Sequence, residues 1–244
     1  MRCWGRYGER RSAQRGVTLL EILVVMVLLS LVVGTVISGS GQLASARLKR
    51  AAAMVTGAVR VGFTRATATS KPQRIVFDMD EDKIWLEEGD RPMLVQSKDL
   101  TGTGGADSAT QAEAAAIADG ERIIKGPTIP RPHYHAVESL GFAEGSGVRG
   151  PRPLGRGIKY REIQAMHDDH PRTTGRAYLY FWPGGQTERA AIQLRIGQST
   201  DDRDALTLII SPLTGKVTVK PGAVSLIIPT DDKEASERED KAGF

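Results

Sequence analysis

Glu21 is the residue whose chemistry most needs an explanation. It lies near the start of a 21-residue run, Val17 to Ile37, and is the only charged residue in that run. A lone carboxylate in hydrocarbon costs about 2.5–3.5 kcal/mol on insertion scales. A cation beside the carboxylate would offset part of that cost. The sequence therefore indicates that Glu21 has a specific role, and a carboxylate that merely reaches the membrane interface is the alternative.

Two pairs of histidines could bind a metal. His133 and His135 form one pair, and His167 and His170 bracket two aspartates. Imidazole and carboxylate ligands suit zinc or nickel. Both pairs fall in a stretch without a regular pattern, so nothing in the sequence fixes the distance between them. We expect exposed loop histidines, with no metal site and no cofactor.

Three aspartates have the alternate spacing of a calcium-binding loop. They are Asp78, Asp80 and Asp82. An EF-hand loop needs glycine at its sixth position and an acid at its twelfth. Lys83 and Gly89 occupy these positions, so the match fails. We expect a solvated acidic turn between two strands.

Sequence motifs of enzymes are missing. The chain has no Gly-x-Ser-x-Gly nucleophile motif and no Gly-x-x-x-x-Gly-Lys-Ser/Thr phosphate loop. Its sole cysteine, Cys3, lies in the basic stretch 1–16 ahead of the apolar run. We expect no enzyme and no catalytic residue, and a metal-dependent periplasmic enzyme built on the histidines is the alternative from that class.

The basic charge is concentrated ahead of the apolar run. The whole chain has a formal net charge of +4, and residues 1–16 hold five arginines and one glutamate, which account for all of it. The remainder is neutral overall, so the sequence gives no reason to expect a nucleic-acid partner. By the positive-inside rule, the amino end lies in the cytoplasm and the body beyond the membrane.

The stretch from Gly16 to Glu21 reads Gly-Val-Thr-Leu-Leu-Glu, ahead of the unbroken apolar run. It resembles the class III signal of type IV pilins and pseudopilins. The resemblance implies that a prepilin peptidase cuts after Gly16, removes the leader 1–16 and methylates the new amine of Val17. Phenylalanine is the usual first mature residue, so Val17 departs from the pattern, whereas Gly16 and Glu21 match it. The resemblance also implies that Glu21 meets the amine of a neighbouring subunit and sets the register of assembly.

An uncut signal anchor and a cleaved secretory signal are the alternatives for the amino terminus. The signal anchor fits the length of the run but leaves Glu21 without a role. A secretory signal has a shorter apolar core and a small-residue cleavage site behind it.

A single long helix is predicted to follow the leader. No proline occurs between Val17 and Lys71, and apolar residues recur with helical spacing beyond the first run. We expect one helix ending near Thr69, with residues 17–37 in the membrane and residues 38–70 as an amphipathic continuation.

The pattern changes to period two after Pro72, which predicts a β-rich head over residues 71–229. The expected strands are 74–78, 83–87, 158–163, 177–182, 190–196, 206–211, 216–220 and 224–228. Residues 97–156 are expected to form a long irregular insertion, partly disordered, with a short helix at 111–118. The tail 230–244 holds six acids against three bases and is expected to be disordered.

This order predicts an α+β, pilin-like fold, in which a long amino-terminal helix packs on an antiparallel β-sheet or β-sandwich head. The closing strands, from Phe181 to Val217, are similar to those of minor pseudopilins of the general secretion pathway protein H type. The resemblance implies a structural subunit of the type II secretion pseudopilus, which helps drive protein export across the outer membrane. It would be held in the bacterial inner membrane by a single pass, with its head in the periplasm.

The implied partners are the major pseudopilin, other minor pseudopilins, the prepilin peptidase and the inner-membrane assembly platform. A minor pilin of a type IV pilus is the alternative within the same class. An uncleaved, membrane-anchored periplasmic binding module is the alternative from a different class.

Overall fold

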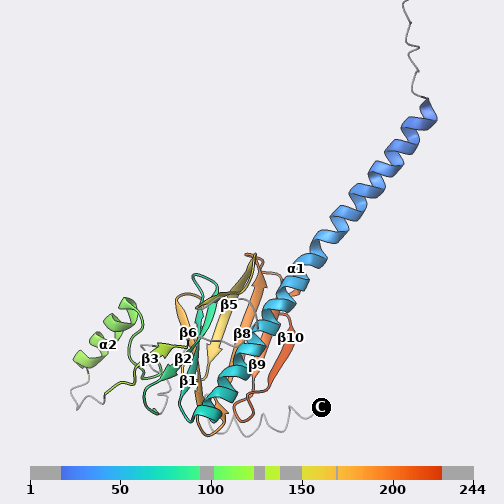
Figure 1. The fold of residues 1–244 in the computed structure, drawn as a ribbon. Helices are drawn as coiled ribbons and strands as arrows, with labels where there is room; N and C mark the ends of the chain where they lie inside the picture. Colours follow the sequence, from blue (N-terminus) through green and yellow to red (C-terminus); the bar gives the residue numbers. More distant parts are fainter. Residues whose placement is uncertain (1–17, 94–101, 124–129, 138–149, 169, 227–244) are drawn as a thin grey trace, which may run out of the picture. The chain divides into compact units, whose positions relative to one another are not determined.

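The computed structural model describes residues 18–93, 102–123, 130–137, 150–168 and 170–226, with the side chains of 34–42 left out. The chain divides into two compact units between residues 43 and 44, and this division falls within helix α1 (Leu19–Thr69; Figure 1). The second unit contains both β-sheets and a second helix. The α+β fold class predicted from the sequence is thereby confirmed.

Helix α1 begins and ends where the local sequence dictates. Its observed bounds differ from the expected ones by two residues at the start and by none at the end. Ser70 adopts a left-handed φ of 53°, which turns the chain out of the helix, and the residue before Pro72 is disfavoured in helical geometry. No proline interrupts the residues between.

The first sheet is antiparallel and built around a hairpin. Its strand order is β3-β2-β1-β6-β7, and β4 pairs with β2 on one side of this path. The predicted pair of strands forms this hairpin, in which Val76 lies opposite Trp85. The strands are β1 (Gln73–Asp78), β2 (Lys83–Gly89), β3 (Tyr134–Ala136), β4 (Arg152–Pro153), β6 (Arg176–Trp182) and β7 (Gln186–Thr187).

The second sheet is also antiparallel, with the order β10-β9-β8-β5. A β-bulge lies between Tyr160 and Glu162. The strands are β5 (Ile158–Ala165), β8 (Ala190–Ile196), β9 (Ala205–Ile210) and β10 (Val217–Pro221), and the short 3-10 helix η1 (Asp202–Asp204) precedes β9.

The strand expected at 224–228 is wrong for its described part, because residues 224–226 are irregular. Gly222 leaves β10 with a φ of 83°. The backbone N–H groups of Val224 and Leu226 then donate to side-chain oxygens, Thr207 Oγ1 at 2.9 Å and Gln164 Oε1 at 2.6 Å. Buried polar side chains therefore satisfy a segment that alternation alone predicted to be a strand.

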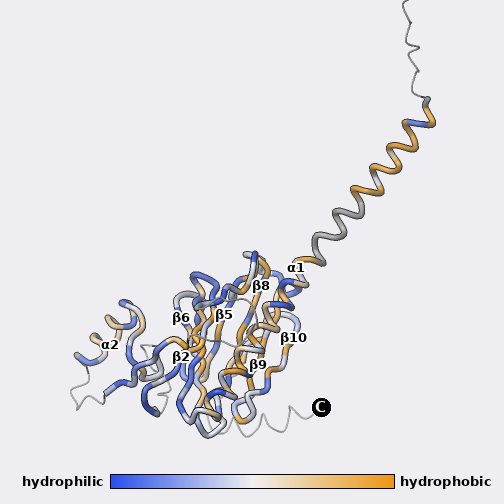
Figure 2. Tube along the Cα trace, viewed as in Figure 1, coloured by the Kyte–Doolittle hydropathy of each residue, from blue (hydrophilic) through white to orange (hydrophobic). Residues whose placement is uncertain are grey.

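The core lies between the second half of α1 and one face of both sheets. The helix contributes a buried stripe of mostly small residues, and Figure 2 shows the apolar positions on the strands. Gly62 is part of this stripe and lies against Phe181. Buried members of the stripe are Leu48, Ala51, Ala52, Val55, Ala58, Val59 and Ala66.

The described part of the 97–156 insertion is integrated into the head, which corrects the expected irregular excursion. Both β3 and β4 come from it and pair with β2. Thr103 and Ala106 are fully buried. Helix α2 (Gln111–Ile123) is longer than predicted. Residues 94–101, 124–129 and 138–149, like the tail 230–244, lie outside the described residues.

Candidate functional site: the start of the first helix and the polar face of the head

Thr18 caps the first turn of α1. Its carbonyl oxygen accepts hydrogen bonds from the N–H groups of Glu21 at 3.0 Å and Ile22 at 3.2 Å. Its hydroxyl oxygen accepts a further bond from the Glu21 N–H at 3.2 Å. A threonine that bonds the N–H three residues on satisfies donors that a helix start leaves open. Gly16 and Val17 lie outside the described residues, directly ahead of this cap.

The same Thr-x-x-Glu pattern starts α2. In a complete capping box the threonine and glutamate side chains each bind the other residue's backbone N–H, and the two helices differ in whether the glutamate does so. In α2 the box is reciprocal: Glu113 N–H donates to Thr110 Oγ1 at 3.2 Å, and Glu113 Oε2 accepts from the N–H of Thr110 at 3.1 Å. Across the described residues, the Glu21 carboxylate forms no hydrogen bond or ion pair. In α1 only the threonine hydroxyl bond of the capping box is formed, so the Glu21 carboxylate can accept a cation from outside the chain.

Large apolar side chains surround Glu21 on every side of the helix. Those of residues 19–33 are 45–83% exposed, and the only charge among these residues is that of Glu21. A contiguous apolar surface of this kind marks a contact with lipid or with other chains. Among the helices in the described part of the chain, none is long and apolar enough to cross a membrane.

The histidines do not converge on a metal site. His167 is buried, which corrects the expectation of an exposed loop histidine, and its Nδ1 atom lies 2.6 Å from Glu188 Oε2. His133, His135 and His170 are exposed. The described ranges contain no group of three or more histidine, cysteine or acidic side chains that could hold a metal.

Burial and ion pairing act in opposite directions on His167. Burial alone lowers the pKa of its imidazole, but the carboxylates of Glu188 and Asp168 outweigh burial and raise that pKa above its usual 6.5. Asp168 is itself bound by Arg172, through Nε and Nη2 at 3.0 Å each. Four ionisable side chains thus link the turn after β5 to the segment that leads into β8.

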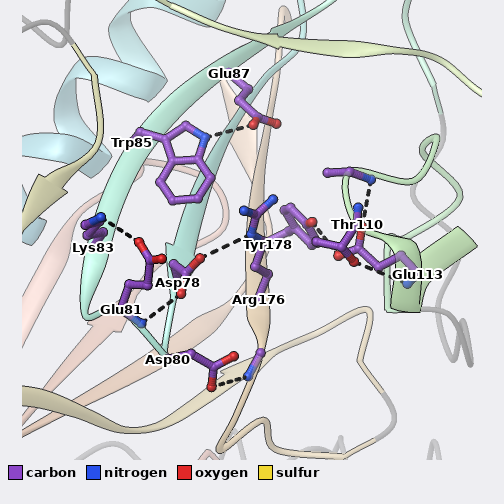
Figure 3. A network of polar contacts seen from close by, with 12 residues as sticks. Asp78, Asp80, Glu81, Lys83, Trp85, Glu87, Thr110, Glu113, Arg176 and Tyr178 are labelled. Atoms are coloured by element: carbon purple, nitrogen blue, oxygen red, sulfur yellow. Dashed lines mark hydrogen bonds and ion pairs between the residues drawn. The ribbon is translucent and has the colours of Figure 1, made fainter.

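The three aspartates of the first hairpin bind protein donors, and Figure 3 shows two of them, Asp78 and Asp80. Asp78 accepts from the Glu81 N–H at 2.9 Å and from Arg176 Nε at 3.2 Å. Asp80 accepts from the Gly175 N–H at 3.2 Å, and Asp82 accepts from the Tyr160 N–H at 3.2 Å. These carboxylates fasten the hairpin turn to neighbouring segments, so their spacing serves the turn.

A buried ion pair that the sequence reasoning missed lies on the face of the first sheet opposite to α1. Arg74 donates to Glu87 Oε2 at 2.7 Å, and Trp85 Nε1 donates to the other carboxylate oxygen at 2.8 Å. The Arg74 guanidinium stacks over Tyr134 and Tyr178, 4.3 Å from each ring centre. Burial alone lowers the pKa of Arg74, but the anionic and aromatic neighbours more than reverse this effect.

The insertion covers this polar face. Tyr178 Oη donates to Glu113 Oε1 at 2.6 Å, and Tyr180 donates its hydroxyl proton to the Thr103 carbonyl at 2.5 Å. Figure 3 shows Tyr178 pointing from the sheet toward Glu113 at the start of α2. Arg176, Tyr178 and Tyr180 alternate with apolar residues in β6, and this was the available signal, because it places polar groups on the face away from the core.

The comparisons first define the class of the amino terminus. The family described as "Prokaryotic N-terminal methylation motif" matches residues 11–37. The match confirms the resemblance to a prepilin-type amino terminus, and the matched range contains Gly16, Val17 and Glu21. A search of curated proteins finds no match.

A particular solved structure is similar to the chain. It is the minor pseudopilin EpsH from the type 2 secretion system of Vibrio cholerae, with a TM-score of 0.39 and 10% sequence identity. The similarity covers 73% of this chain and 99% of that chain.

Proposed function

We propose that this chain is a structural subunit of the pilin type, and specifically a minor pseudopilin of a type II secretion system. The observation that carries the proposal is the coincidence of the methylation motif at residues 11–37 with a capped helix that exposes apolar side chains and one free carboxylate. A helix start of this kind can pack against other subunits through its apolar side chains and pair with a cation through its carboxylate. This role needs no catalytic group.

The proposed assembly begins with cleavage between Gly16 and Val17 by a prepilin peptidase, followed by methylation of the Val17 amine. Before assembly, residues 17–37 anchor the subunit in the inner membrane with the head in the periplasm. The amine then lies one residue ahead of the Thr18 cap. The free carboxylate of Glu21 accepts the amine of a neighbouring subunit, because pairing lowers the cost of burying both charges.

The proposed partners follow from this sequence of events. The prepilin peptidase processes the chain, the inner-membrane platform assembles it, and the major and other minor pseudopilins surround its helix. The head contributes a rigid periplasmic surface whose hairpin and insertion are held by the polar network described above.

Mass spectrometry of the amino terminus tests the proposal. Full-length chain isolated from membranes of its host should begin with N-methylated Val17. A Gly16→Leu variant is the matched control and should accumulate as precursor, because the cleavage position accepts no side chain. Recovery of the native chain with Met1 and the whole leader would support the uncleaved anchor instead. Copurification with a type IV pilin and no pseudopilin would assign the chain to the other kind of filament.

A further inference from the structure

The second half of α1 carries positive charge only. After Glu21 the helix contains five basic residues and no acidic one. Arg65 is paired with Glu88 at 3.2 Å. The other four have exposed side chains and make no hydrogen bond or ion pair with described residues; they are Arg47, Lys49, Arg50 and Arg60.

Two of these cations lie on one line along the helix, on the side away from the core. Positions 46, 50, 53, 57, 60 and 64 follow each other at alternating intervals of four and three residues, the spacing that brings side chains to one helix face. Arg50 and Arg60 alternate there with small residues, and the buried stripe lies on the opposite side. We call this side the Arg50 face; its members are Ala46, Arg50, Ala53, Gly57, Arg60 and Thr64.

The charge of this face selects against a second copy of itself. Among its six members the face holds two bases, Arg50 and Arg60, and no acid. Two such faces in contact would place cations against cations, and like-charge juxtaposition costs several kcal/mol. The small residues between the arginines permit a helix to approach closely, as they do at helix seams.

We propose that the Arg50 face docks a helix of a different subunit that carries Asp or Glu at matching positions. The inference rests on the proposed function, since it needs a filament in which helices lie side by side. It adds the chemistry of the neighbour: an acidic helix face, with repulsion excluding a second copy of this chain. A subunit of this kind enters a filament only beside unlike subunits, which fits a minor component.

Site-specific crosslinking with charge reversal tests the proposal in the full-length chain. A photoreactive probe on the variant Ala53→Cys lies in the middle of the face, and the only other cysteine is in the leader. The chain is coexpressed with the pilin-type subunits encoded beside it. The double variant Arg50→Glu/Arg60→Glu should lower crosslinking to one of them by about tenfold or more. Lys220→Glu is the matched control, because that cation is exposed on β10 and has no described partner.

The rescue decides between occupants. Crosslinking should return when Asp or Glu residues on the helix of the crosslinked subunit are changed to Lys. Rescue by removing the acidic tail 230–244 instead would overturn the proposal in favour of an intrachain contact. Undiminished crosslinking of the double variant, crosslinking to a second copy, or loss without rescue by any helix charge reversal would also overturn it. The unaltered chain must first show methylated Val17 and incorporation, so a failure of the proposed function is recognised separately.

Discussion

Gly62 of α1 lies directly against Phe181 of β6. A Cβ atom at Gly62 would stand 2.9 Å from Phe181 Cε2 and 3.3 Å from Leu86 Cδ1. Real Cβ atoms do not come that close to a ring carbon, so the helix can pack at this distance only because the side chain is missing. The contact sets how closely the helix covers the first sheet.

Replacing Gly62 with alanine should destabilise the head by about 1 kcal/mol or more, since overpacking outweighs the gain in helix propensity. Urea unfolding followed by circular dichroism gives the change. Gly120→Ala in α2 is the matched control, because nothing lies within 4 Å of its Cβ position. That variant should be neutral or stabilising by up to about 1 kcal/mol. Equal effects of the two substitutions would show that the contact with Phe181 has no energetic weight.

A substitution of Glu21 should separate cleavage of the leader from incorporation into filaments. In the proposed assembly, Glu21→Val should still be cleaved after Gly16, because position 21 lies beyond the proposed cleavage site, but it should no longer enter filaments. Precursor and mature forms are followed by mass spectrometry, and incorporation is followed in sheared filament fractions. Glu113→Gln, at the equivalent place in the α2 capping box, should leave incorporation unchanged. Normal incorporation of Glu21→Val would remove the pairing argument.

Glu88 should make the head sensitive to acid. The Lys71 ammonium at 2.6 Å, with help from Gln73 and Arg65, lowers the pKa of this carboxyl from 4.5 to about 2. A lowered folded-state pKa contributes stability that is present above the unfolded value and lost as pH falls. The free energy of unfolding should therefore decline between about pH 4.5 and pH 2. Glu88→Gln should flatten this decline, measured by urea titrations at several pH values, and an unchanged slope would assign it to other carboxylates.

His167 should make the head less stable as the pH rises, whereas Glu88 makes it less stable as the pH falls. Its pKa is raised above 6.5 because the carboxylates of Glu188 and Asp168 outweigh burial. Stability from a raised pKa is complete below pH 6.5 and is lost as pH rises through the folded-state value. Glu188→Gln should remove this alkaline loss and lower stability at pH 6, as followed by the urea midpoint. Imidazole resonances that titrate at or below the ordinary value would contradict the prediction.

Removing one charge of the buried Arg74–Glu87 pair should be costly. Glu87→Gln keeps an acceptor for Trp85 Nε1 but leaves the guanidinium without its anion. The expected loss is about 3–5 kcal/mol of unfolding free energy. The double variant Arg74→Met/Glu87→Gln should lose less than the sum of the single variants, because it leaves no unpaired charge. An additive result from a double-mutant cycle would mean that the two residues are energetically independent.

Much of this architecture could be predicted from the sequence because its signals are local. Proline-free helical spacing predicts α1, and two short runs rich in β-branched and aromatic residues around the turn at 79–82 predict the hairpin of β1 and β2. The signal around Glu21 is local as well, because the resemblance to prepilin signals is carried by one continuous stretch, which the methylation-motif family matches at residues 11–37. The environments of Arg74 and His167 depend on partners far along the chain, such as Glu188 and Tyr134, and no local pattern reports those contacts.

Local sequence patterns gave wrong predictions in two segments whose structure depends on contacts with residues distant in the chain. The segment 97–156 is rich in glycine and proline, which predicts irregular chain, yet β3 and β4 from it extend the first sheet. The 224–226 stretch alternates like a strand but is bound by side chains of Thr207 and Gln164. In each case a neighbour distant in sequence supplied the hydrogen bonds.

The insertion covers the face of the first sheet that carries Arg74, so the length of this insertion and the side chains of the strands beneath it depend on each other. Tyr178 and Tyr180 direct their hydroxyl groups to Glu113 and Thr103, which both belong to that cover. A chain trimmed of residues 102–137 would open the guanidinium and both phenols to water. A shorter insertion would therefore require changes to the polar side chains of β1 and β6. A design that transfers the insertion to another head should transfer those strand residues with it.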